Sequence, residues 1–113
     1  MFHSINAYTG ETLCRCPAQS YAEFAQELVA LKVRQQAFAR LGVTGRTALL
    51  QAFAERLAQN KERLAEMVCE EVGRCLHECR AELDKSVELI RYYVRFALEL
   101  LAYKTIATQA SLS

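Results

Sequence analysis

Five cysteines are the residues of this 113-residue chain best suited to act as nucleophiles or metal ligands, and they occupy positions 14, 16, 69, 75 and 79. Cys75, His77 and Cys79 lie close together in the sequence, and residues four apart share a helix face on which thiolate and imidazole groups both bind zinc. Cys14 and Cys16 could complete a set of four ligands. However, a Cys-x-Cys pair and a distant Cys-x3-Cys pair do not have the spacing of a zinc finger, so we predict no metal site.

A catalytic cysteine needs a neighbouring base or a local positive charge that lowers its pKa. Cys69, Cys75 and Cys79 fall on or beside predicted helices, without a glycine-rich turn and without a recognisable His and acid partner. We interpret them as small apolar side chains in or near a core. An odd number of cysteines in a helix-rich chain also predicts free thiols rather than a disulfide framework. No catalytic residue is predicted.

Two further motifs have residue types that occur in binding sites. The G-V-T-G stretch at residues 42–45 lacks the lysine and the preceding strand of a phosphate-binding loop. Arg91, Tyr92 and Tyr93 could stack on nucleobases, but acidic residues surround them, and we predict that they pack at a helix interface. No cofactor-binding residue is therefore predicted in this chain.

The composition is that of a globular protein, with 52% apolar and 24% charged residues and a formal net charge of +1. Basic and acidic residues are mixed along the chain, which argues against nucleic acid or an anionic membrane as the main partner. No apolar run approaches the roughly 20 residues that cross a bilayer. The first residues also lack a secretory signal pattern, so we expect a cytoplasmic protein.

Hydrophobic spacing predicts one mainly α-helical, partial domain over residues 1–113, which begins with a β-hairpin. Ser20 and Glu23 have the form of a capping box, Thr44 and Asn60 could cap later helices, and Gly73 suits a left-handed helix end. These signals give a hairpin over 4–16, helices over about 21–40, 45–59, 61–72 and 76–103, and a possible strand over 105–113. A lone hairpin is marginal in water, so it should pack against a partner.

Each predicted helix carries an apolar stripe at helical spacing. The first three stripes are Phe24, Leu28, Leu31 and Phe38; Leu49, Leu50, Phe53 and Leu57; and Leu64, Met67, Val68 and Val72. The last helix has the longest one, which consists of Leu83, Val87, Ile90, Val94, Ala97 and Leu101. A continuous stripe of this length must be covered by another element.

Three segments carry a resemblance to a known family. They are I-N-A-Y-T-G-E at 5–11, E-V-G-R-C at 71–75 and R-Y-Y at 91–93, joined by helices of matching order and spacing. Together they resemble the N-terminal portion of the aldehyde dehydrogenase superfamily, nearest to the succinate-semialdehyde dehydrogenase type. Ala7 replaces the usual proline of the first segment, and Arg74 and Cys75 stand for a lysine and a proline in the second.

The resemblance implies that this chain is a truncated piece of the α/β aldehyde dehydrogenase fold. Full-length members use NAD or NADP to oxidise aldehydes, possibly succinate semialdehyde here, to carboxylic acids. Their catalytic and nucleotide-binding groups come from later segments that do not occur in this sequence, so the chain alone should be inactive and hold no cofactor. The expected partner is the remainder of the dehydrogenase subunit or a second copy of the chain. The alternative is an independent helical interaction or oligomerisation module.

Overall fold

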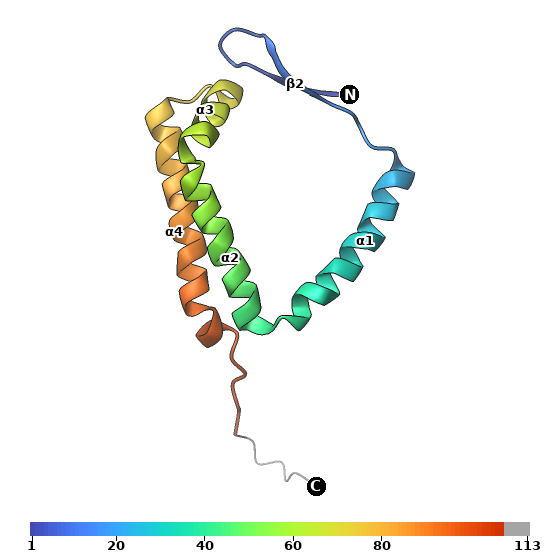
Figure 1. The fold of residues 1–113 in the computed structure, drawn as a ribbon, viewed down its shortest axis with the longest axis vertical. Coiled ribbons are helices and arrows are strands. Elements are labelled where there is room, and N and C mark those ends of the chain that lie inside the picture. The colour runs from blue at the N-terminus through green and yellow to red at the C-terminus, as the bar shows by residue number, and fades with distance from the viewer. Residues whose placement is uncertain (108–113) are drawn as a thin grey trace.

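The fold, a computed structural model that describes residues 1–107, is mainly helical and begins with a β-hairpin, as the sequence predicted (Figure 1). Strands β1 (Phe2–Ile5) and β2 (Thr12–Cys16) form the hairpin. Four helices follow, which are α1 (Tyr21–Arg40), α2 (Gly42–Gln59), α3 (Lys61–Val72) and α4 (Leu76–Leu100).

The hairpin is antiparallel and starts two residues earlier than predicted, because Phe2 pairs with Cys16 at its open end. Its turn is built around Asn6 and Gly10. The Asn6 side-chain oxygen accepts hydrogen bonds from the backbone amides of Tyr8 and Thr9, at 2.9 and 3.0 Å, and Gly10 has a φ of 74°. The side-chain amide thus replaces backbone partners within the turn, as Asn commonly does.

Helix α1 begins with the predicted capping box. The Ser20 side chain accepts a bond from the Glu23 amide, and the Glu23 carboxylate accepts one from the Ser20 amide at 2.7 Å. These bonds favour the charged carboxylate, so they lower the pKa of Glu23 below its usual value. Local side-chain chemistry therefore determines where this helix starts.

Of the two caps predicted for later helices, Thr44 is wrong, whereas Asn60 occupies the N-cap position of α3 but makes no side-chain capping bond. Helix α2 begins at Gly42 rather than at residue 45, and Thr44 lies inside its first turn, where its carbonyl accepts a bond from the Thr47 hydroxyl. Asn60 separates α2 from α3 as expected, but its side-chain amide donates to the Arg56 carbonyl at 2.8 Å instead of capping α3. The side chain thus closes the end of the preceding helix.

The C-terminal end also differs from the prediction. Helix α4 ends at Leu100 rather than at residue 103, and its last turn closes through the Leu101 amide. Residues 105–107 form no strand. The rest of the predicted strand lies outside the described residues.

The core lies where α4 runs back along α2 and α3 (Figure 1). Its fully buried apolar side chains are Ala54, Ala65, Cys79 and Val87. Two of these are alanines, and small side chains let helix axes approach closely. Three ion pairs on the exposed rim, Lys61 with Asp84, Arg80 with Glu62, and Arg74 with Glu82, accompany this packing. Exposed pairs of this kind contribute little, so burial holds the three helices together.

The predicted stripe of α4 is confirmed from Leu83 to Ala97, whose stripe residues are buried or half-buried, but it is wrong for Leu101, which lies beyond the helix end and is exposed. The stripe of α2 faces α4 only in part, because Leu50 lines a hollow with Tyr93 and Ala97 of α4 and Leu57 is half-buried. Ala54 is fully buried there, whereas Phe53 is 52% exposed and Leu49 is equally open. On α3, Met67 likewise points away from the core. Leu49, Phe53 and Met67 belong to apolar surfaces that residues 1–107 leave open.

Gly73 ends α3 in the left-handed conformation, with a φ of 76° and a ψ of 25°. An added Cβ would also meet the Ala7 Cβ at 3.0 Å. We expect Gly73→Ala to cost about 1–2 kcal/mol from backbone strain, and more from this contact, measured as a lower urea midpoint by circular dichroism. Gly10→Ala is the matched control, since its φ is 74° but nothing lies within 4 Å. An unchanged midpoint for Gly73→Ala would contradict the assignment.

Candidate functional site

The hairpin packs against the C-terminal end of α3, which is the partner that the sequence predicted without identifying it. The Ala7 amide donates to the Glu70 carbonyl and the Tyr8 hydroxyl donates to the Gly73 carbonyl, each at 2.8 Å. The Ser4 hydroxyl donates to the Glu71 carboxylate at the same distance. The last carbonyls of a helix have no partner within it, so the hairpin acts as a cap for α3. Sequence reasoning missed this junction, which joins residues more than 60 positions apart.

The five cysteines are free and form two groups. Cys14 and Cys16 are exposed on β2, with their sulfur atoms 3.8 Å apart. Cys69, Cys75 and Cys79 lie around the junction of α3 and α4, close enough to Tyr8 to affect its titration. Of these three, Cys79 is buried, Cys69 is half-buried and Cys75 is exposed. The interpretation as buried apolar side chains therefore holds for Cys79 and is wrong for Cys75.

The environments of Cys69 and Cys16 favour the neutral thiol, because each raises the pKa of its thiol. Partial desolvation, followed by the charges of nearby thiols, raises the pKa of Cys69 and that of the Tyr8 hydroxyl. The hydrogen bond with Cys14 raises the pKa of Cys16. A nucleophilic cysteine needs a lowered pKa, so neither Cys69 nor Cys16 is prepared for covalent catalysis. In the described part of the chain, no group of three His, Cys, Asp or Glu side chains could hold a metal ion.

The residues present do not fit a dinucleotide. Such a cofactor binds where a glycine-rich turn leads from a parallel strand into a helix, whereas the sheet formed within residues 1–107 is a two-stranded antiparallel hairpin. Gly45, in the G-V-T-G stretch, has a packing role instead. A Cβ there would lie 2.8 Å from the Leu41 Cβ, so the glycine permits close contact with the preceding turn.

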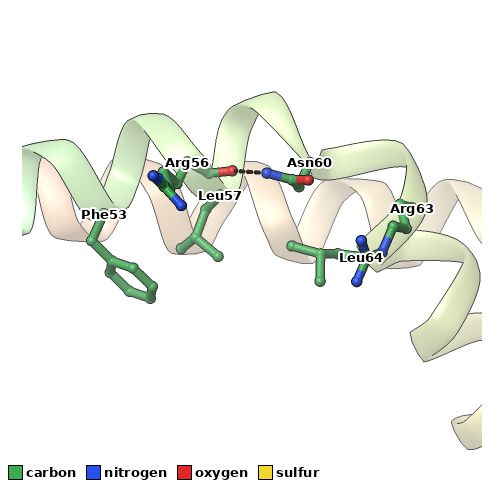
Figure 2. Close-up of a pocket in the computed structure, with 6 residues that line it drawn as sticks. All are labelled: Phe53, Arg56, Leu57, Asn60, Arg63 and Leu64. Atoms are coloured by element: carbon green, nitrogen blue, oxygen red, sulfur yellow. Dashed lines mark hydrogen bonds between the residues drawn. The ribbon is translucent and has the colours of Figure 1, made fainter.

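A groove along α2 and α3 is the first of two apolar hollows on the helical surface (Figure 2). In Figure 2, Phe53, Leu57 and Leu64 point to the same side of α2 and α3. Asn60 and two arginines complete the lining, and the hollow measures about 220 Å³. The arginines are Arg56 and Arg63. An apolar hollow with an asparagine and two arginines in its lining suits contact with another apolar element that carries polar groups at its edge.

A second hollow, of about 320 Å³, opens between the first turns of α2 and the end of α4 and is almost wholly apolar. Its lining consists of Thr47, Leu50, Tyr93, Ala97, Leu100 and Leu101. Tyr93 and its neighbour Tyr92 are each 54% exposed. The helix interface predicted for them is therefore not supplied within the described residues.

Helix α1 carries the most isolated apolar surface. It stands apart from the other helices (Figure 1), and none of its residues is buried. We call Phe24, Leu28, Leu31 and Phe38 the α1 stripe; its members are 40–55% exposed. The radius of gyration is 20.7 Å, whereas a compact chain of roughly 100 residues has about 13 Å. The described chain thus leaves open surfaces that a self-sufficient domain would bury.

Comparison with known proteins identifies the family of this chain. The model of the aldehyde dehydrogenase family matches residues 1–112. The chain belongs to the aldehyde dehydrogenase family. No helix within residues 1–107 is long and apolar enough to cross a membrane.

The similar dehydrogenases are much longer than this chain. A malonate-semialdehyde dehydrogenase of Listeria monocytogenes is 33% identical over 88 residues, which is 78% of this chain and 18% of that protein. A succinate-semialdehyde dehydrogenase [NADP(+)] of Deinococcus radiodurans is 30% identical over 108 residues, or 93% of this chain and 22% of that protein. The chain thus spans about a fifth of the length of these relatives.

A solved structure of a dehydrogenase shares the fold of this chain. A glyceraldehyde-3-phosphate dehydrogenase of Methanocaldococcus jannaschii, complexed with NADP, superposes with a TM-score of 0.87 at 20% identity. The match covers 96% of this chain and 24% of that one. The arrangement of the hairpin and the helices, with α1 standing apart from the others, therefore also occurs in that longer dehydrogenase chain.

Proposed function

We propose that this chain is the N-terminal part of an NAD(P)-dependent semialdehyde dehydrogenase and supplies packing surface rather than catalytic groups. The observation that carries the proposal is the open apolar surface, above all the α1 stripe, on a chain that spans about a fifth of its relatives. In this proposal the remainder of the subunit covers the α1 stripe and both hollows.

The substrate class follows from the relatives, which are named for malonate and succinate semialdehyde. NAD or NADP would be bound by the remainder, because the described residues do not form a dinucleotide site. A nucleophile, an oxyanion site and a base must meet in one pocket for this oxidation. The thiols at the hairpin and at the α3–α4 junction have no such companions, so the chain alone should be inactive.

A chimera tests this proposal. The chain replaces the matching part of the Deinococcus radiodurans succinate-semialdehyde dehydrogenase, and NADPH formation with succinate semialdehyde is followed by absorbance. We expect the chimera to regain activity that the relative loses when that part is deleted. A folded chimera without activity, or one that fails to fold, would contradict the role as a replaceable packing segment. Turnover by the 113-residue chain alone would contradict its inactivity.

A further inference from the structure

Two thiols share the face of the hairpin that meets α3. Cys14 and Cys16 occupy alternate positions on β2 and therefore point to the same side of the sheet, with their sulfur atoms 3.8 Å apart. Ser4 is paired with Cys14 across the hairpin and donates to Glu71 of α3 at 2.8 Å. Because directly paired residues point to the same side, the face that carries both thiols is the one turned toward α3.

A thioether lies on the facing surface of α3. Met67 precedes Glu71 by four residues, so the two side chains occupy one face of the helix. Met67 is 49% exposed and takes no part in the core against α4. It lines, together with Cys14 and Glu71, a hollow of about 230 Å³ between the hairpin and α3. Cys14 and Met67 thus line one hollow, and the Cys16 sulfur, which is not part of that lining, lies 3.8 Å from the Cys14 sulfur.

The ligand set determines which ion would suit this junction. Thiolate and thioether sulfur atoms are soft ligands; zinc takes thiolate, imidazole and carboxylate ligands, whereas copper(I) also accepts a thioether. Residues 1–107 offer no group of three His, Cys, Asp or Glu side chains that could hold a metal ion, so a site at this junction needs the thioether as its third ligand. We propose that Cys14, Cys16 and Met67 bind one copper(I) ion between the hairpin and α3.

Binding would involve proton release without electron transfer. Each thiol loses its proton when its sulfur forms a bond to the metal, and the methionine sulfur donates a lone pair without losing a proton. Two protons therefore leave for each ion bound, and copper stays in the +1 state. The bound ion would join β2 to α3 and so reinforce the junction in which the hairpin caps that helix. This proposal does not depend on the dehydrogenase activity.

The test is a copper(I) titration of the 113-residue chain, free of oxygen, against the coloured competitor bicinchoninate. We expect one ion per chain. Cys14→Ser and Cys16→Ser should weaken binding by more than about 100-fold, and Met67→Leu by about tenfold. Cys75→Ser is the matched control, since it removes an exposed thiol outside this junction and should leave the affinity unchanged. Circular dichroism checks that each variant keeps its helices.

Four outcomes would overturn the proposal. Wild-type affinity in the Cys14→Ser, Cys16→Ser double variant would place any bound copper elsewhere, as would a loss caused by Cys75→Ser. Wild-type affinity in Met67→Leu would remove the thioether from the site. X-ray absorption of the loaded chain gives an independent readout, with three sulfur neighbours expected around copper. Two sulfur neighbours would contradict the ligand set.

Discussion

Replacing Val87 by aspartate should abolish cooperative folding of the helical part of the chain. Val87 is 5% exposed at the centre of the α4 stripe, in a core whose other buried members are Ala54, Ala65 and Cys79. Its burial is worth about 1.5–3 kcal/mol, and the carboxylate would in addition lose its hydration without gaining a partner. Because the core contains so few buried side chains, the free energy of unfolding should be small.

Thermal unfolding followed by circular dichroism at 222 nm measures this effect. Leu89→Asp is the matched control on the same helix, because Leu89 is 56% exposed. It should lose only the helix propensity difference, about 0.5 kcal/mol. The Val87→Asp chain should show a reduced helical signal and no sigmoidal transition. Similar unfolding curves for the two variants would show that this α4 stripe is not the core.

Features governed by local chemistry could be predicted from the sequence. The bonds that start α1 at Ser20 and the left-handed end of α3 at Gly73 each depend on a few neighbouring residues. The α4 stripe from Leu83 to Ala97 was also predicted correctly, because its residues share one helix face whatever covers them. Periodicity alone therefore identifies an apolar face.

Periodicity does not identify the partner of that face. The sequence predicted Phe53 on the packing side of α2, whereas Ala54 is the residue buried there, because the small side chain allows α4 to approach. The junction of Ser4 with Glu71 could not be predicted either, since nothing local links the hairpin to the end of α3. Such contacts depend on the tertiary arrangement. The apolar residues that are exposed although the sequence predicted them to pack form the surfaces that, in our proposal, the remainder of a dehydrogenase subunit covers.

The α1 stripe should also make the isolated chain self-associate. Single exposed apolar residues are normal on a protein surface, but here four large apolar side chains lie along one helix face. A contiguous apolar surface of this kind favours association. In Leu28→Gln, Leu31→Gln the helix propensity is nearly kept while the apolar surface is removed. If each leucine contributes about 1.5 kcal/mol at the interface, the pair should weaken association by roughly 100-fold.

Sedimentation equilibrium over a range of concentrations measures the dissociation constant. The matched control is Val29→Gln, Val33→Gln, which changes two exposed valines that lie roughly opposite the stripe at 3.6 residues per turn. The control should associate like the original chain, whereas the leucine variant should remain monomeric. Equal association of both variants would show that the stripe is not the contact surface. If instead the original chain stays monomeric at every concentration, the uncovered stripe does not drive association, and its role would then have to be tested in the chimera alone.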